Sequence, residues 1–389
     1  MRRRAILIVL DGCGAGAAPD AADFGDSGEN EGHTLRNVWN LCGGLQAPLL
    51  ARMGYFAAAG IDAGPIEGVC GRLREVSIGK DTVTGHWEMM GIHLEKPFPT
   101  YPKGFPIPLV KEFEERIGRQ TIGNEAASGT EIINRLGETH LSTGCPILYT
   151  SADSVFQLAC HEDVIPVDQL YEMCRIAREM LVPPHNVGRV IARPFLGNPS
   201  EGFVRTNRRK DFPIAPPRCL VDEIAESVGE VFGIGVVPEV FAERGFRPVR
   251  RTQSNAEHEA LLHEALLSDA RFIFCNFEDF DMLYGHRNDP RGFGNALEAF
   301  DLTLGSVLPR LREDDLLILT ADHGNDPTTP STDHSREYVP FAAWSLGLPV
   351  AGLIPDRDGL WNVGATVAEW LGLTADRGSS LLSDPALVQ

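Results

Sequence analysis

Short apolar runs alternate with longer amphipathic stretches along most of the chain. Four of the runs are almost entirely apolar, which is typical of strands buried on both faces of a sheet. They lie at 5–10, 231–234, 272–277 and 316–319. Stretches with the apolar spacing of helices lie at 219–228, 255–267 and 295–311. This alternation predicts an α/β fold with a mostly parallel sheet core and helices on both faces.

Proline clusters interrupt this alternation twice, at 97–108 and at 213–217. Between them lies a separate set of elements. Helical patterns occupy 109–117 and 167–180, and apolar runs occupy 146–149 and 189–192. A proline-rich linker at each end of such a set predicts an inserted α+β cap domain at 97–217. The core is then discontinuous, formed by 1–96 and 218–389.

The charge balance is strongly acidic, with 54 acidic and 35 basic residues and a formal net charge of -19. This balance disfavours nucleic acid and anionic membranes as partners, and an anionic substrate needs clustered arginines or bound cations. The eight cysteines are scattered without a CxxC pair. They are typical of reduced thiols in a cytoplasmic protein. The apolar run at 5–10 is too short for a signal peptide, and no stretch is long enough to cross a membrane.

Carboxylate and imidazole side chains follow three of the predicted strands. Asp11 follows the first directly, Asp281 and His286 come shortly after the strand at 272–277, and the strand at 316–319 leads to three more residues. These are Asp322, His323 and His334. Strand ends in open α/β sheets are where ligands bind.

Each of these six residues also has an ordinary structural explanation. Asp11 would cap its own turn, Asp322 would cap a helix, and the histidines would lie on the surface. Three Asp and three His together are nevertheless the ligand set that two divalent ions require, and mixed oxygen and nitrogen ligands suit Mn or Zn. Such a pair of ions activates a hydroxyl and neutralises phosphate oxygens, so the set indicates phosphoryl chemistry.

The segment at 78–90 has the pattern of a loop that turns into a short helix, with Thr82 near the amino end. Exposed backbone N–H groups at such an end hold phosphoryl groups well. A threonine there is also an ordinary N-cap residue. As a nucleophile it needs a nearby metal ion, because its hydroxyl is otherwise weakly reactive.

Longer motifs accompany these residues along almost the whole chain. They are VLDG at 9–12, GKDTVTGHWEMMG at 79–91, IGNEAASGTEII at 122–133, YTSADSVFQLACHE at 149–162, GRVIARPFLG at 188–197, DFDMLYGHR at 279–287, TADHGNDP at 320–327 and TDHSREYVP at 332–340. With them the chain resembles the phosphopentomutases of the alkaline phosphatase superfamily, which are related to cofactor-independent phosphoglycerate mutase. The resemblance implies an alkaline-phosphatase-like core and an isomerase that interconverts ribose or deoxyribose 1- and 5-phosphates. It further implies a phosphothreonine enzyme, a bisphosphorylated sugar intermediate and activation by a sugar bisphosphate.

The resemblance also assigns roles to individual residues. It implies that Thr82, in preference to Thr84, carries the phosphoryl group. It implies one manganese ion held by Asp11, Asp322 and His323, a second held by Asp281, His286 and His334, sugar hydroxyls held by Asp153, and a distal phosphate clamped by Arg189 and Arg205. By spacing alone, the two arginines are equally well explained as ordinary surface residues.

Two departures from the family pattern concern the substrate. Val236 stands where the family has a lysine that contacts the distal phosphate, and the segment after Arg205 carries the basic run Arg208-Arg209-Lys210. Either this run compensates for the missing lysine, the interpretation we favour, or the chain acts on a different sugar phosphate. A two-metal phosphatase, a phosphoglycerate mutase on the same core and an inactive metal-bound scaffold are the remaining alternatives. The sequence indicates no oligomeric state.

Overall fold

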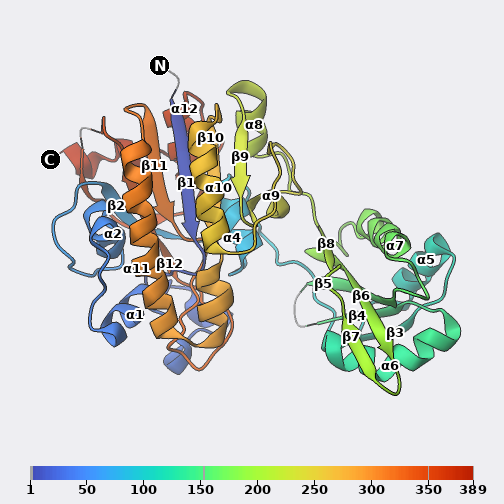
Figure 1. The fold of residues 1–389 in the computed structure, drawn as a ribbon. Helices are drawn as coiled ribbons and strands as arrows, with labels where there is room; N and C mark the ends of the chain where they lie inside the picture. The colour runs from blue at the N-terminus through green and yellow to red at the C-terminus, as the bar shows by residue number, and fades with distance from the viewer. Residues whose placement is uncertain (1–2, 152–153, 349, 389) are drawn as a thin grey trace. The chain divides into compact units, whose positions relative to one another are not determined.

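The computed structural model describes residues 3–151, 154–348 and 350–388. It divides the chain into two compact units, the first of Met1–Lys96 with Pro216–Gln389 and the second of Pro97–Ala215 (Figure 1). Pro216 and Pro217, expected in the inserted segment, fall in the first unit. Arg244 of the first unit explains this, because it donates from Nη1 to the Pro216 carbonyl at 2.8 Å and from Nη2 to the Pro217 carbonyl at 2.6 Å.

The first unit is built on a sheet in which the strands have the order β13-β2-β12-β11-β1-β10-β9, with β14 beside β2. Its strands are β1 (Arg4–Leu10), β2 (Val69–Arg74), β9 (Val231–Ile234), β10 (Phe272–Phe277), β11 (Asp315–Thr320), β12 (Tyr338–Trp344), β13 (Gly352–Leu353) and β14 (Arg357–Asp358). Strands β9, β10, β1 and β11 run parallel, and β12 is antiparallel to both neighbours. All residues of these four parallel strands are buried, as expected where helices cover both faces. The predicted mostly parallel sheet is confirmed.

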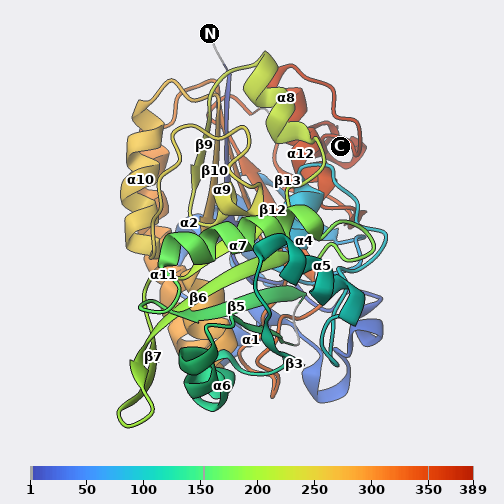
Figure 2. The same cartoon turned by 90° about the vertical axis from the view of Figure 1, so that its right-hand side faces the viewer.

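Helices cover both faces of this sheet, with α10 and α11 on one side and α12 and α4 on the other (Figure 2). The helices of the unit are α1 (Thr34–Cys42), α2 (Pro48–Met53), α3 (Tyr55–Ala58), α4 (Thr82–Met89), α8 (Leu220–Ser227), α9 (Val237–Val240), α10 (Asn255–Leu267), α11 (Pro290–Val307) and α12 (Trp361–Leu371). Helix α11 begins five residues before the predicted start at Asn295. The Asp289 side chain caps it by accepting from the Gly292 N–H at 2.9 Å, and Pro290 suits its first turn.

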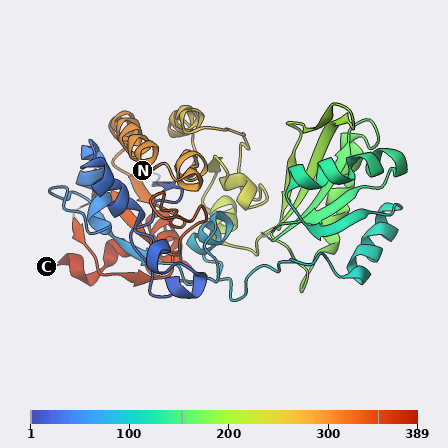
Figure 3. The same cartoon turned by 90° about the horizontal axis from the view of Figure 1, so that it is seen from below.

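The second unit has its own sheet of order β3-β4-β5-β6-β7, with β8 beside β6. Figure 3 shows this unit in green with its sheet and helices. Its elements are β3 (Ile122–Ala126), β4 (Ile147–Thr150), β5 (Val155–His161), β6 (Arg189–Asn198), β7 (Gly202–Arg205), β8 (Lys210–Pro213), α5 (Ile107–Ile117), α6 (Gly129–Thr143) and α7 (Val167–Met180). Helices α5 and α7 pack on one face around Leu148 and Phe156, and α6 packs on the other around Ile147 and Tyr149. Neighbouring residues of β4 thus face opposite cores, as the pleat requires.

None of the helices among the described residues combines the length and the apolar character needed to span a membrane.

Candidate active site

The predicted ligands converge at one edge of the first sheet. Strand β1 lies between β10 and β11, and all three run parallel, so their carboxyl ends meet there. Asp11 follows β1 directly, Asp322 lies two residues beyond β11, and Asp281 lies in a π-helical turn at Phe280–Tyr284 after β10. All three carboxylates are buried. The register of the sheet therefore brings together residues more than 300 positions apart in sequence.

The three histidines lie against these carboxylates. His323 Nε2 is 3.4 Å from both Asp11 Oδ1 and Asp322 Oδ2. The other two histidines lie against Asp281. His286 Nε2 is 3.1 Å from Asp281 Oδ2, and His334 Nε2 is 3.5 Å from Asp281 Oδ1. All six residues singled out from the sequence thus belong to one cluster, and the surface location considered for the histidines does not apply to the buried His323.

Two groups within the cluster have the geometry of metal sites. Asp281, His286 and His334 form one, and Asp11, Asp281 and His323 form the other, with potential ligand atoms within 4.8 Å of one another in each. Asp281 belongs to both groups, whereas the resemblance assigns it to one ion only. How the ligands divide between two ions stays a prediction.

Two asparagines that the sequence reasoning missed orient the carboxylates. Asn276 Nδ2 donates to Asp11 Oδ2 at 2.6 Å, and Asn325 Nδ2 donates to Asp281 Oδ1 at 2.6 Å. Asn276 is the polar residue within the otherwise apolar strand β10, and this exception is the signal that identifies it. Partners of this kind hold metal-binding carboxylates in place.

The imidazoles are oriented in the same way. His286 Nδ1 lies 2.7 Å from the Thr332 carbonyl, and His323 Nδ1 lies 3.1 Å from the Gly324 carbonyl. Each carbonyl can only accept, so the proton of each neutral ring is assigned to Nδ1. The Nε2 atoms face the carboxylates, and a bound ion would take the Nε2 lone pairs in place of a proton.

The electrostatics of the cluster also fit bound cations. Burial raises the pKa of Asp11 well above its ordinary value, and repulsion from Asp322 and Asp281 adds to the rise. Hydrogen bonding to Asp281 raises the pKa of His286 to about 9. Asp11 Oδ1, Asp322 Oδ2 and His334 Nε2 are buried and have no protein hydrogen-bond partner. Divalent cations would satisfy these atoms and offset the crowded negative charge.

Thr82 lies beside this cluster, with its Oγ1 3.3 Å from His323 Nε2. The N-cap of α4 is Asp81 and not Thr82, because the Asp81 Oδ1 atom accepts from the N–H groups of Val83 at 3.0 Å and Thr84 at 3.2 Å. The expectation of exposed N–H groups at this end was therefore wrong for these two residues. Thr84 is buried, and its hydroxyl donates to Asp81 Oδ2 at 2.8 Å. Thr82 is the hydroxyl positioned at the ligand cluster.

Comparison with known proteins places this geometry in a family. Residues 220–375 match the model of the Metalloenzyme superfamily. The phosphopentomutase of Clostridium acetobutylicum is 47% identical over 378 residues, which cover 95% of this chain and 96% of that one. The phosphopentomutase of Dictyoglomus thermophilum is 49% identical over 389 residues, which cover 98% of each chain. The chain belongs to the phosphopentomutase family. It is an enzyme, a phosphomutase, and the superfamily match agrees with a cluster that binds divalent metal.

The predicted substrate residues of this phosphopentomutase family member lie in the second unit. Arg189 begins β6, and its Nη1 is 3.6 Å from Asp211 Oδ2. Arg205 ends β7, where it lies opposite Phe195 of β6. Asp153 lies outside the described residues. The substrate contacts of all three therefore stay predictions.

The residues that distinguish this chain from the phosphopentomutase pattern are already engaged. In the basic run, Arg208 Nη1 donates to Glu162 Oε2 at 2.9 Å, and Arg209 Nη2 donates to Asp211 Oδ2 at 2.6 Å. Lys210 Nζ lies 5.3 Å above the ring centroid of Tyr171. The Arg208 and Arg209 side chains are 59% and 44% exposed, whereas Glu162 and Asp211 are 13% and 7% exposed. A doubly negative ligand would therefore have to draw the arginines from carboxylates that are largely buried.

Val236 lies in the first unit. It precedes α9, and its backbone N–H donates to Glu278. A cavity of about 210 Å³ beside it is lined by Glu278, Arg250 and Arg251, among others.

Proposed function

We propose that the protein interconverts the 1-phosphate and the 5-phosphate of ribose or deoxyribose, with Thr82 as the carrier of the phosphoryl group. Relatives named phosphopentomutase, 47% and 49% identical over nearly the full chain, support this reaction and a pentose phosphate substrate. The observation that carries the proposal is the position of Thr82 Oγ1, 3.3 Å from His323 Nε2 at the edge of the ligand cluster.

In the proposed cycle, phosphorylated Thr82 meets a sugar monophosphate. A bond forms between phosphorus and the free sugar hydroxyl oxygen, the bond from phosphorus to Thr82 Oγ1 breaks, and the hydroxyl proton is transferred to the Oγ1 that leaves. The bisphosphorylated sugar then returns its other phosphoryl group to Thr82 by the reverse exchange. A sugar bisphosphate also loads unphosphorylated enzyme, and this explains the proposed activation by such a compound.

The ligand cluster would hold two divalent ions. We assign Asp11, Asp322 and His323 to one ion, which Thr82 also approaches, and Asp281, His286 and His334 to the other. Mn²⁺ suits this set best, since the three imidazoles favour a borderline ion over a hard one such as Ca²⁺. When bound, such ions lower the pKa of a hydroxyl and neutralise phosphate oxygens. Asn276 and Asn325 keep the carboxylates in position for them.

The second unit is the proposed site of sugar phosphate recognition. Arg189 and Arg205 would clamp the distal phosphate, because the guanidinium fork matches phosphate oxygens with two donors. Asp153 would hold the sugar hydroxyls. We place the protein in the cytoplasm, where its eight free thiols stay reduced.

A product assay tests the proposed reaction. The Mn-loaded enzyme is incubated with ribose 1-phosphate and a trace of ribose 1,5-bisphosphate, and the products are followed by phosphorus NMR. We expect ribose 5-phosphate to accumulate without inorganic phosphate. Release of inorganic phosphate at the rate of substrate loss would instead identify a phosphatase, and no turnover of ribose or deoxyribose phosphates would point to a different sugar.

A further inference from the structure

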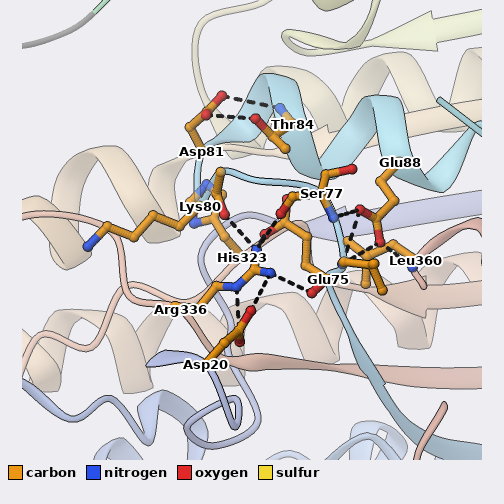
Figure 4. A network of polar contacts seen from close by, with 12 residues as sticks. Asp20, Glu75, Ser77, Lys80, Asp81, Thr84, Glu88, His323, Arg336 and Leu360 are labelled. Carbon is orange, nitrogen blue, oxygen red and sulfur yellow. Dashed lines mark hydrogen bonds and ion pairs between the residues drawn. The ribbon is translucent and has the colours of Figure 1, made fainter. Parts of the chain in front are cut away.

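Arg336 is a buried arginine that the proposed chemistry does not use, and its guanidinium lies at the centre of a polar network (Figure 4). On one side it pairs with Asp20, where Nη2 donates to Oδ2 at 2.9 Å. On the other side Nη1 donates to Glu75 Oε2 at 2.8 Å. Two carboxylates thus face one buried cation, so Arg336 has its counter-charge within the network.

The remaining donors of Arg336 bind the backbone of the segment that leads into Thr82. Nη2 donates to the Glu75 carbonyl at 2.6 Å, and Nη1 donates to the carbonyls of Ser77 at 3.0 Å and Gly79 at 2.6 Å. Strand β2 ends at Arg74 and α4 begins at Thr82, so this segment has no regular secondary structure to fix its backbone. Arg336 supplies the hydrogen-bond donors that these backbone carbonyls would otherwise find in a strand or helix.

Local side chains hold the same segment from the side of α4. The Glu88 carboxylate accepts from the Val76 N–H at 2.9 Å and also from the N–H groups of Ser77 and Leu360. A Cβ atom on Gly79 would lie 2.4 Å from Thr84 Oγ1, so the segment is packed directly against the helix that begins with Thr82. A displacement of the Gly79 carbonyl would therefore move the start of α4.

Arg336 reaches this segment from the loop that carries the metal ligands. It lies two residues after His334, and the preceding Ser335 exchanges backbone hydrogen bonds with Gly324, the neighbour of His323, at 2.7 and 3.1 Å. Asp26 also connects the metal-ligand loop to the segment before Thr82. It accepts from the Arg336 backbone N–H at 2.7 Å and from Lys80 Nζ at 3.0 Å.

From these contacts we infer that Arg336 is a positioning residue that fixes Thr82 Oγ1 relative to His323 and His334. The inference rests on the proposed function of Thr82 as the phosphoryl carrier. Lysine at this position keeps the charge but lacks the planar fork, so it cannot bind three carbonyls and two carboxylates at once. A misplaced nucleophile lowers the rate of phosphoryl transfer while leaving the binding of the sugar phosphate unchanged.

The test compares Arg336→Lys with Arg4→Lys. Arg4 is equally buried and donates from Nε to Asp315 Oδ1 at 2.9 Å and from Nη1 to the Leu266 carbonyl at 2.8 Å. Arg4 begins β1, and Asp11 follows the other end of that strand, roughly 20 Å away. Arg4→Lys is therefore a control for the loss of a buried arginine far from the ligand cluster. Both variants are expected to melt at a lower temperature. Arg336→Lys is expected to lower kcat about 30-fold and to keep KM for ribose 5-phosphate within about twofold of wild type. Arg4→Lys is expected to leave kcat unchanged.

The decisive readout is the rate at which Thr82 is phosphorylated by ribose 1,5-bisphosphate, measured per folded molecule by quenched flow and mass spectrometry. A structural role alone would leave this rate unchanged in the folded fraction, and that result would overturn the inference. Phosphorylation of wild type on another residue would instead reject the proposed function itself.

If Arg336→Lys fails to fold, Asp20→Asn decides, because the Asp20 carboxylate accepts from the Arg336 guanidinium at Nη2 at 2.9 Å and at Nε at 3.3 Å. An asparagine has one acceptor oxygen in place of two and no charge, so the guanidinium is held less firmly. A fall in kcat of about threefold or more at constant KM supports the inference, and an unchanged kcat rejects it.

Discussion

The ligand cluster of the first unit and the arginines of the second unit are held by different means. The cluster lies at the ends of parallel strands whose pairing is fixed over six residues on each side of β1, and its carboxylates are buried. Arg189, Arg208 and Arg209 have side chains that are 38%, 59% and 44% exposed, and each pairs with a carboxylate of its own unit.

The fold therefore fixes the positions of the cluster carboxylates, whereas the arginine side chains take positions that depend on which negative charge they bind. A buried carboxylate at a strand end has no alternative location, because the whole sheet would have to change register. The three arginines are exposed enough for a substrate phosphate to reach them, but the phosphate has to compete with Glu162 and Asp211, whose side chains are 13% and 7% exposed. The cluster should therefore respond to substitution with large losses, and the arginine region with graded changes in KM.

Removal of divalent metal should have the largest effect. We expect chelation followed by dialysis to reduce kcat by at least about a thousandfold, because bound ions supply several kcal/mol of charge stabilisation. Mn²⁺ should restore activity better than Ca²⁺, given the imidazole ligands. Activity and metal content are measured on the same samples. Full turnover in protein shown to be free of metal would contradict the account of the cluster.

Asp281→Asn should show whether Asp281 binds one metal ion or both. Asp281 belongs to both potential ligand groups, whereas His286 belongs to one. Because we assign both residues to the same ion, we expect Asp281→Asn and His286→Gln each to lose one Mn²⁺ ion, as measured by elemental analysis after equilibrium dialysis. Loss of both ions from Asp281→Asn alone would contradict that assignment and show that the two groups share Asp281.

Neutralising the basic run of the second unit should raise KM moderately. If Arg208, Arg209 and Lys210 compensate for the family lysine, replacing all three with glutamine raises KM for ribose 5-phosphate about tenfold, or about 1.4 kcal/mol. The value of kcat should change little, because none of the three residues is assigned as a metal ligand or as the phosphoryl carrier. An unchanged KM at fixed Mn²⁺ concentration would reject the compensation.

Val236→Lys should have the smallest effect. A lysine there would add a charged contact to the distal phosphate, worth about 1.5–3 kcal/mol where it is not screened. The neighbouring Glu278, which accepts from the Val236 N–H, offsets part of that gain. We expect KM to fall about threefold, with Val236→Met as the control for side-chain length. If the control lowers KM as much, the charge is not responsible.

The sequence predicted the cluster well because its supporting strands are almost entirely apolar runs. The ranges expected for β9, β10 and α10 agree with the structure, and Asp11, Asp281 and Asp322 follow from strand ends alone. Strand β12 is harder to find, because Pro340 lies within it although it is paired on both sides. Proline cannot donate to a neighbouring strand and normally argues against a central position.

The partners of the supporting residues could not be predicted from the sequence, for a different reason. Asn276, Asn325 and Arg336 act through partners that are 44 to 316 positions away, and nothing in the local pattern reveals such a partner. Arg336 in particular looks like any charged residue of a loop until its burial is known. Partners of the basic run, such as Glu162 for Arg208, are equally invisible in the sequence.

The central claim is that Thr82 carries the phosphoryl group, and Thr84 provides a matched control two residues away. Wild type, Thr82→Ala and Thr84→Ala are incubated with ribose 1,5-bisphosphate and Mn²⁺, and intact mass and peptide mapping follow. We predict one added phosphoryl group on Thr82 in wild type and in Thr84→Ala, and none in Thr82→Ala, which should still bind metal. A phosphate adduct that persists in folded, metal-loaded Thr82→Ala would contradict the account.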